Sequence, residues 1–396
     1  MIRNISVGID VGSMTTRVVV GEFIKGEKNP KIIGVGESTT EGVRHGYVIN
    51  GTLAATSIKK AVLQAEETSG IKIKRAFVSL SGTTLRGEIS SGGTIVSKAD
   101  GEVTSIDINK ALQDCEDNLS GLSTGNKKII HTYPLSFRLD GKEVLGRLEG
   151  MRGTKLEAKA IFVTYSVVHL EDLLGAIAEA GVETISVIAS PISLSDITLS
   201  EKQKIVGVAL VDIGDQTTSL SVFENGLLVS TCTFSIGSSD ITNDIALGFK
   251  IPLQKAESLK LGSLSAQAGI TPEYSKKKLD EIIEARLSDI FELIENNLKK
   301  IKRSELLPAG IVWVGGGSNT PLLPELSRSI LKLPSVLGTT EIFGNAKTKL
   351  RDSSWFTVLG LLTAGKENGG YSGSSLRNLF KDLKNSIKSS LKQLMP

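Results

Sequence analysis

The chain has 396 residues, and its 40% hydrophobic and 22% charged residues exclude wholesale disorder. Every apolar run is shorter than the roughly 18 residues that a membrane-spanning helix needs, and Asp10 interrupts the first run, which argues against a signal peptide. Two distant cysteines, Cys115 and Cys232, exclude a disulfide scaffold, a zinc finger and a cysteine-held cluster within one chain. We therefore expect a soluble protein of a reducing compartment.

The net charge of +3 is unevenly distributed. Residues 376–396 carry five basic side chains and one acidic one, so the rest of the chain is close to −1. So small a charge gives no electrostatic footprint for nucleic acid, and we expect no nucleic-acid partner.

Short strands rich in β-branched residues alternate with amphipathic helices in the first part of the chain. We expect strands at Ile5–Val11, Arg17–Phe23 and Lys31–Gly36, then a helix at Thr52–Ser69 with Leu53, Ile58, Val62 and Ala65 on one face. The region Ser81–Lys159 is richer in Gly, Ser, Thr and charge. We interpret it as an inserted subdomain that ends near Ala160.

The second part repeats this alternation of strands and helices. We expect strands at Ile161–Tyr165, Ile205–Val211, Thr217–Phe223, Leu227–Phe234 and Ile311–Val314. Helices are expected at Val167–Ala180, Ser239–Phe249, Leu253–Leu261 and Ser275–Lys302. The polar, Gly/Ser-rich segment Lys366–Ser375 is typical of a flexible linker.

One short motif occurs twice. Asp10–Thr16 and Asp212–Thr218 both read Asp–aliphatic–Gly–x–x–Thr–Thr, and each lies between two strands. Such a repeat predicts two similar half-domains that face each other. A tight turn with Gly lets backbone N–H groups approach phosphate, and Asp10 and Asp212 are candidate Mg²⁺ ligands, acting through water.

A third glycine-rich turn, Gly315-Gly316-Gly317-Ser318, follows a buried strand and precedes a helix expected near Pro321. Glycines at this point allow close approach to a nucleotide. The same pattern also fits an ordinary tight turn between a strand and a helix.

Longer segments make the pattern more specific. They are Gly42–Gly46, Val78–Gly82, His131–Leu135, Gly150–Ala158, Gly237–Ala246 and Ala256–Lys260. The two facing turns and the glycine-rich turn resemble those of the actin, sugar-kinase and heat-shock-chaperone ATPase superfamily. Within it, the longer segments and the basic tail resemble the FtsA family of bacterial cell-division proteins, over nearly the whole chain.

The resemblance implies an actin-like, duplicated ribonuclease-H-like α/β fold of two domains, with an FtsA-type inserted subdomain and a C-terminal amphipathic helix. The expected boundaries are 1–83 and 163–204 for the first half, 84–162 for the insertion, 205–365 for the second half, 366–375 for the linker and 376–396 for the helix. It also implies ATP in the central cleft, with Mg²⁺ as its partner.

The resemblance also assigns nucleotide-binding residues. The first phosphate turn would comprise Gly12, Ser13, Met14 and Thr15, and the second Gly214, Asp215, Gln216 and Thr217. Gly237 and Ser238 would lie near the sugar and phosphates, and Glu257 and Lys260 near the ribose and adenine. Gly316 and Gly317 would border the base, with Gly315 and Ser318 in the same turn.

The chain departs from the family pattern at these turns. Asp215-Gln216 replaces the usual Gly-Gly, and the Asp215 carboxylate would repel phosphate unless it turns away or meets Mg²⁺. Ser219 stands where the family often has Asp, and Thr15 where Lys is common, although Arg17 follows. These departures predict nucleotide binding with weak or absent hydrolysis.

The C-terminal segment has one continuous apolar stripe opposite a basic face. We expect it to bind anionic membrane lipids as a helix lying in the interface, through Leu376, Leu379, Phe380, Leu383, Ile387, Leu391 and Leu394 and through Arg377, Lys381, Lys384, Lys388 and Lys392. The alternative is a helix packed on its own domain or on a partner helix.

As a member of the family, the chain would anchor the tubulin-like FtsZ ring, through the FtsZ C-terminal tail, to the cytoplasmic face of the membrane at the division septum. It would also self-assemble into filaments and meet later division proteins. A PilM-like pilus adaptor is the alternative. A sugar kinase or a dehydratase activator is a third possibility, although the two cysteines do not offer the cluster that activators need.

Overall fold

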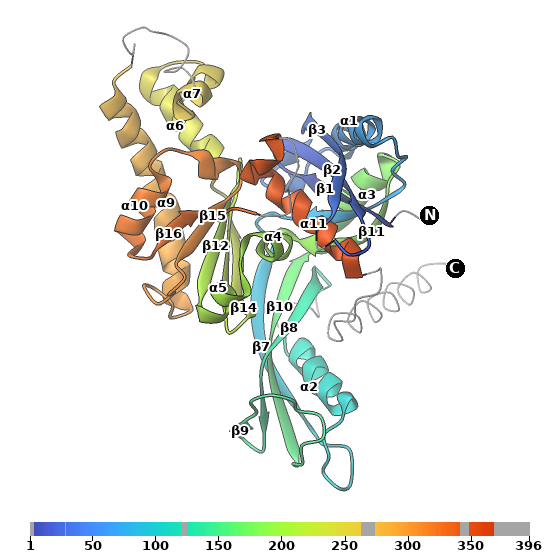
Figure 1. Ribbon diagram of the computed structural model, residues 1–396. Coiled ribbons are helices and arrows are strands. Elements are labelled where there is room, and N and C mark those ends of the chain that lie inside the picture. Colours follow the sequence, from blue (N-terminus) through green and yellow to red (C-terminus); the bar gives the residue numbers. More distant parts are fainter. Residues whose placement is uncertain (1–3, 28, 120–124, 263–273, 341–347, 368–396) are drawn as a thin grey trace.

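The computed structural model describes residues 4–27, 29–119, 125–262, 274–340 and 348–367 (Figure 1). The expected basic helix at 376–396, and all but the first two residues of the expected linker, lie outside these ranges. Within them, no helix is both long and apolar enough to cross a bilayer.

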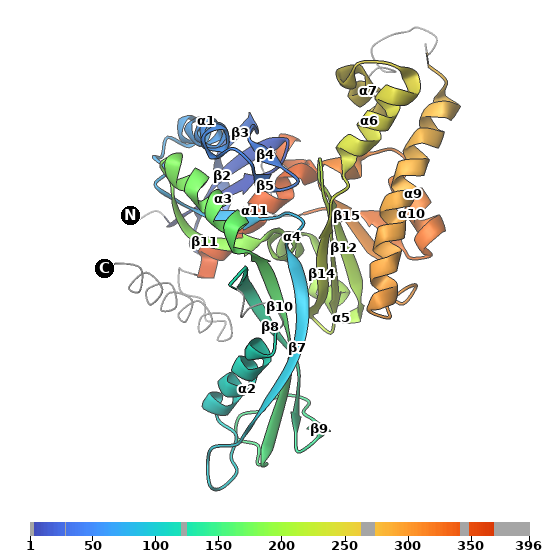
Figure 2. The same cartoon turned by 180° about the vertical axis from the view of Figure 1, so that it is seen from behind.

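A five-stranded sheet forms the first half, in the order β11-β6-β1-β2-β3. Strands β1, β2 and β3 form an antiparallel meander, and β6 and β11 run parallel to β1. The bounds are β1 Asn4–Val11, β2 Thr15–Phe23, β3 Lys31–Thr39, β6 Arg75–Leu80 and β11 Glu183–Ala189. Helices α1 (Gly51–Ser69) and α3 (Val167–Glu179) cover one face, and α4 (Ser190–Thr198) and α11 (Phe356–Glu367) cover the other (Figures 1 and 2).

The second half repeats this sheet strand for strand. Written in the same direction, its order is β16-β15-β12-β13-β14. Strands β12, β13 and β14 form the same antiparallel meander, and β15 and β16 run parallel to β12. The bounds are β12 Val208–Ile213, β13 Thr218–Glu224, β14 Leu227–Phe234, β15 Ile311–Val314 and β16 Ser335–Leu337. The two similar half-domains predicted from the repeated motif are therefore confirmed.

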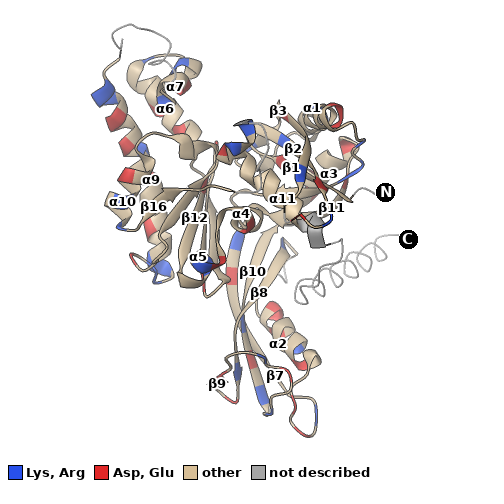
Figure 3. Ribbon diagram, in the orientation of Figure 1, with Lys and Arg blue, Asp and Glu red and all other residues tan. Residues whose placement is uncertain are grey.

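Helices α6 (Ser238–Phe249), α7 (Leu253–Lys260), α9 (Lys276–Lys300) and α10 (Leu323–Leu331) belong to the second half. An apolar stripe of α9 packs on the sheet, with Leu287, Ile290 and Ile294 fully buried. Basic side chains gather at the two ends of this helix, and the part between them is mostly acidic (Figure 3).

Between the two halves the prediction of a strand starting at Ile205 is wrong. Ile205 and Val206 end a short helix, α5 (Glu201–Val206), which Ser200 and Gln203 cap reciprocally. Gly207, with φ of 110°, then turns the chain into β12. Leu53, expected on the buried face of α1, is 42% exposed.

The inserted subdomain consists of strands β7 (Arg86–Ile95), β8 (Lys127–Leu139), β9 (Lys142–Glu143) and β10 (Lys155–Ser166), with α2 (Ser105–Asp117) against them. It projects from the two halves as an arm (Figures 1 and 2). Its strands continue the sheet of the second half into nine strands, through the single pair Cys232 and Arg86. The strand expected at Ile161–Tyr165 is the end of the longer β10, which crosses the expected end of the insertion near Ala160.

One hydrophobic core spans both halves, and the second half and the insertion each have a smaller one. The shared core joins strand residues of the first half, such as Val18, to Val208 and Val312 of the second half and to Trp355. Trp313 and Trp355 are both buried. The halves are thus held together by packing as well as by the connecting chain.

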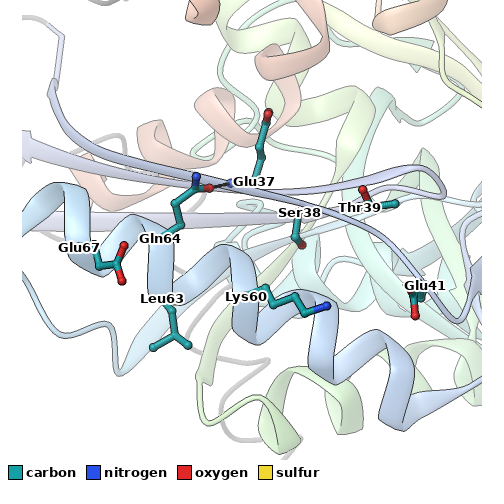
Figure 4. Close-up of a pocket in the computed structure, with 8 residues that line it drawn as sticks. All are labelled: Glu37, Ser38, Thr39, Glu41, Lys60, Leu63, Gln64 and Glu67. Carbon is teal, nitrogen blue, oxygen red and sulfur yellow. Dashed lines mark hydrogen bonds between the residues drawn. The ribbon is translucent and has the colours of Figure 1, made fainter.

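Helix α1 seals the free edge of the first sheet. Gln64 Oε1 accepts a hydrogen bond from Glu37 N at 2.6 Å, and Thr68 Oγ1 accepts one from Val35 N at 2.9 Å. These contacts satisfy amides of β3 that would otherwise be free to pair with another strand. An open groove of about 630 Å³ lies between α1 and β3 and contains neither phosphate turn (Figure 4).

The close approach of α1 to β3 depends on glycine. A Cβ at Gly36 would lie 2.0 Å from the Ala61 carbonyl oxygen, so we expect Gly36→Ala to lower the free energy of unfolding by about 3 kcal/mol. Gly175→Ala is the control, because a Cβ there meets open space on α3 and should stabilise by up to about 1 kcal/mol. Urea unfolding midpoints measure both. Equal midpoints for the two variants would contradict the packing argument.

Candidate nucleotide site

The two repeated turns have the same hydrogen-bonded geometry. Gly12 N–H donates to Thr15 O at 3.2 Å, and Gly214 N–H donates to Thr217 O at 2.8 Å. A Cβ on Gly12 would lie 2.9 Å from Thr15 O, so the close turn favours glycine. Met14, at the tip of the first turn, is 57% exposed.

The carboxyl groups of Asp10 and Asp212 come from opposite halves and lie close enough for the Asp10 charge to act on Asp212. Burial raises the pKa of Asp212 from its ordinary 3.8 to about 7, the Asp10 charge adds to the rise, and Arg17 opposes it. Burial also raises the pKa of Asp10, against a hydrogen bond from Ser79 Oγ and the Arg17 charge. Carboxylate oxygens so placed are ligands that suit Mg²⁺.

The positive charge of Arg17 acts on both carboxyl groups and lowers the pKa of each. Arg17 lies opposite Asp10 in the β1–β2 ladder, whereas Ser219 takes the equivalent place opposite Asp212. Its guanidinium lies 5.3 Å from the centre of the Trp355 ring. Among the described residues, its buried Nε has no hydrogen-bond partner.

The second turn rests on the first turn of α6. Ser238 N–H donates to Gly214 O at 2.9 Å, and Ser239 N–H donates to Asp215 O at 2.8 Å. A Cβ on Gly237 would lie 2.4 Å from Asp215 O, so only glycine fits there. The predicted site residues of this region therefore lie side by side.

Lys260 and Glu257 form an ion pair of 2.7 Å beneath this turn. Lys260 is only 3% exposed, and its Nζ also donates to Ser238 O at 3.1 Å and to Thr242 Oγ1 at 2.8 Å. Burial raises the pKa of Asp215, and the Lys260 charge lowers it. The Asp215 carboxylate, which we expected to repel phosphate, therefore has the buried Lys260 cation as a neighbour.

The glycine-rich turn packs against the end of β12. A Cβ on Gly315, which has φ of 85°, would lie 2.1 Å from Asp212 Oδ1, and one on Gly317 would lie 2.3 Å from Ile213 Cγ2. Ser318 Oγ donates to Gly315 O at 2.8 Å. Gly316 has more room, with Ser354 as its nearest neighbour at 3.7 Å.

After this turn the chain forms a 3₁₀ turn, η1 (Gly316–Asn319), and then α10. The helix expected near Pro321 thus starts at Leu323. The third predicted turn therefore joins the second one at the Asp212 carboxyl.

The structure adds a segment that the sequence did not assign to the site. His45 N–H donates to Gln216 Oε1 at 2.9 Å, and His45 Nδ1 lies 3.1 Å from Gln216 O. The next amide, of Gly46, donates to Ser13 Oγ at 3.1 Å. The motif Gly42–Gly46 was a signal of the family, but nothing in it indicated these partners.

The other two histidines have structural roles. His131 Nε2 accepts a hydrogen bond from Ala189 N at 3.1 Å, and burial lowers the pKa of His131 to about 4. The His169 ring stacks on Tyr47 with ring centres 3.9 Å apart.

A duplicated five-stranded sheet with two facing Asp–Gly turns, and an insertion before β11, defines the actin-like class of proteins. Solved structures agree on the fold. The PilM–PilN type IV pilus biogenesis complex matches with a TM-score of 0.66 at 16% identity, covering 91% of this chain and 98% of that chain. MreB5 of Spiroplasma citri bound to ADP matches with a TM-score of 0.51 at 12% identity, covering 93% and 99%.

Sequence comparison is more specific. The model of cell division protein FtsA matches residues 209–360, and that of the SHS2 domain inserted in FtsA matches residues 82–164. Cell division protein FtsA of Pseudomonas aeruginosa is 30% identical, over 93% of this chain and 91% of the relative. The Bacillus subtilis protein is 28% identical, over 93% and 85%. The chain belongs to the FtsA family of cell division proteins, with an actin-like fold and an SHS2 insertion.

The raised pKa of Asp212 predicts how stability depends on pH. The folded chain holds this proton more tightly than the unfolded chain, so the wild type loses stability as the pH rises from about 4 to about 7. Asp212→Asn removes the loss, and we expect it to stabilise by about 2 kcal/mol more at pH 8 than at pH 4. This difference is less than the roughly 4 kcal/mol that corresponds to the full pKa shift of Asp212, because Asp212 is partly exposed to solvent.

Chelator-treated protein unfolded in urea at the two pH values measures the difference. Asp172→Asn, at an exposed position of α3, controls for the change in net charge. A gain from Asp212→Asn that is the same at both pH values would contradict the prediction.

Proposed function

We propose that the chain binds ATP and Mg²⁺ between its two phosphate turns, and that it links the FtsZ polymer to the cytoplasmic face of the membrane at the division site. The observation that carries this is the meeting of Asp10 and Asp212, from equivalent strand ends of a duplicated sheet, in a chain of the FtsA family. MreB5, a protein of the same fold, is bound to ADP.

The residues present suit a nucleotide with a divalent cation. Burial raises the proton affinity of both carboxyl groups, the Asp10 charge raises that of Asp212 further, and a cation beside them would relieve that repulsion. Mg²⁺ would supply charge that neutralises phosphate oxygens. Arg17, whose buried Nε has no hydrogen-bond partner among the described residues, offers a second positive charge.

The proposed nucleotide contacts divide among three parts of the site. The backbone of the two phosphate turns would hold the phosphates, because glycine lets amides approach anions closely. Ser238 and the Lys260–Glu257 pair would bound the sugar side, and Gly315–Ser318 the base. Hydrolysis would be weak or absent, since Asp215 and Gln216 fill the second turn with side chains.

The C-terminal segment would act as the membrane anchor. Its apolar stripe and five basic residues suit an anionic bilayer surface. A single helix of this kind binds weakly, and filaments of the protein would add many such helices together. Nucleotide-linked assembly would in this way strengthen attachment at the septum.

The FtsZ C-terminal tail would bind to the second half, in the region 238–310 that contains α6, α7 and α9. Downstream division proteins would be further partners. A PilM-like adaptor is the second candidate, favoured by the likeness to the PilM–PilN complex. That likeness is one of fold at 16% identity, whereas the sequence relatives carry the FtsA name over most of the chain.

The nucleotide step predicts a Mg²⁺-dependent effect of Asp10→Asn. The amide keeps the shape of the carboxyl but loses its charge, so we expect binding of Mg·ATP to weaken at least about tenfold. Binding of ATP in the presence of a chelator should change much less. Fluorescent ATP titrations with and without Mg²⁺ measure this, with Asp172→Asn as control. Equal Mg²⁺ dependence in wild type and Asp10→Asn would rule out the carboxylate role.

The anchor predicts that a chain ending at Gly373 no longer sediments with anionic vesicles. The double variant Lys384→Gln and Lys388→Gln should lose most of the binding to anionic vesicles, because each cation near such a surface contributes about 1 kcal/mol. Lys276→Gln and Lys277→Gln, exposed on α9, form the matched control. With FtsZ present, only vesicles that carry the full chain should sediment FtsZ. If the shortened chain binds as well as the full one, the anchor lies elsewhere.

A further inference from the structure

One loop of the first half holds both phosphate turns at once. The amides of His45 and Gly46 are consecutive, yet they donate to opposite halves, the first to Gln216 Oε1 and the second to Ser13 Oγ. The loop lies between two short paired strands, β4 (Val43–Arg44) and β5 (Tyr47–Val48). An anion held by both turns would therefore meet two donors that already have protein acceptors.

The loop has a backbone conformation that needs support. His45 has φ of 49° and Gly46 has φ of 79°. A left-handed conformation is unfavourable for a residue with a side chain, so surrounding contacts must hold His45 in place. Gln216 supplies two of these contacts, one through its side chain and one through its backbone oxygen.

Gln216 makes a contact that the glycine usual at this position cannot make. A glycine has no side-chain oxygen, and in the first turn the equivalent residue is the exposed Met14. The amide oxygen of Gln216 therefore ties the second phosphate turn to the loop of the first half. The tie is neutral, whereas a phosphate oxygen is a charged and stronger acceptor.

We propose that Gln216 is a built-in latch, which a terminal phosphate displaces from the His45 amide. The inference rests on the proposed nucleotide site and deepens it, because it makes the loop 42–48 a sensor of nucleoside triphosphate. A diphosphate, lacking the terminal group, leaves the latch closed. Breaking one neutral hydrogen bond weakens triphosphate binding about fivefold relative to a turn without the latch.

The other side of the loop contacts the base of the inserted subdomain. A Cβ on Gly46 would lie 2.6 Å from Gly82 Cα, so two backbones touch there. Tyr47 Oη shares a hydrogen bond with Thr83 Oγ1, and Tyr165 Oη donates to Ser81 O at 2.8 Å. Movement of the loop 42–48 therefore also displaces residues 81–84, where the chain enters the inserted subdomain.

The latch is tested first on protein free of nucleotide, by hydrogen exchange resolved to single amides. Gln216→Met keeps the length of the side chain but lacks the acceptor, and Gln216→Glu keeps an acceptor. We expect the His45 amide to exchange at least about tenfold faster in Gln216→Met and as slowly as wild type in Gln216→Glu. Unchanged amides in α9 show that the variants are folded. Equal His45 exchange in Gln216→Met and wild type overturns the latch.

The phosphate step is tested by titrating a non-hydrolysable ATP analogue and ADP. We expect Gln216→Met to bind the analogue about fivefold tighter and ADP unchanged, and only the analogue to alter exchange at residues 81–84 of the wild type. An equal effect on both nucleotides overturns the sensor. If the wild type binds neither nucleotide, the proposed function fails and the phosphate step with it, whereas the exchange result still decides the latch.

Discussion

The structure is organised around two acidic side chains, Asp10 and Asp212, that interact through their charge at the junction of two equivalent sheets. Asp10 and Asp212 each lie one residue before the end of the central strand of their half, and burial raises the pKa of both. Like charges in such a place are unfavourable unless a cation compensates them. Arg17 compensates in part, and a divalent cation suits the same place. The two halves thus meet at a place where negative charge is only partly compensated.

This junction dictates the glycines around it. Gly315 lies against the Asp212 carboxyl and Gly237 against the Asp215 carbonyl, each too close for a side chain. Backbone therefore reaches the centre of the site from several elements. The hydrophobic core shared by the two halves includes Trp355, whose ring packs against Arg17, and this packing opposes separation of the halves. The close backbone packing and the buried charge therefore both follow from the way the two sheets meet at Asp10 and Asp212.

Much of the fold could be predicted from the sequence because its elements carry local signals. The repeated Asp–Gly motif predicted the duplicated sheet, and the strands and α9 followed their hydrophobic periods. The prediction of a strand at Ile205–Val206 was wrong. The β-branched residues favour a strand, but the capping pair Ser200 and Gln203 starts a short helix that includes them. The link between His45 and Gln216 had no local signal at all, since 171 residues separate them. The same holds for the single residue pair that joins the arm to the second sheet.

The duplicated halves have diverged where they meet. Arg17 in the first copy corresponds to Ser219 in the second, so only one half brings a cation to the carboxyl pair. Conversely, Gln216 of the second copy reaches across, whereas its counterpart Met14 is exposed. The loop that receives Gln216 comes from the first half alone, so equivalent positions of the two turns meet different surroundings. Departures from the repeat therefore mark the contacts through which one half can respond to the other.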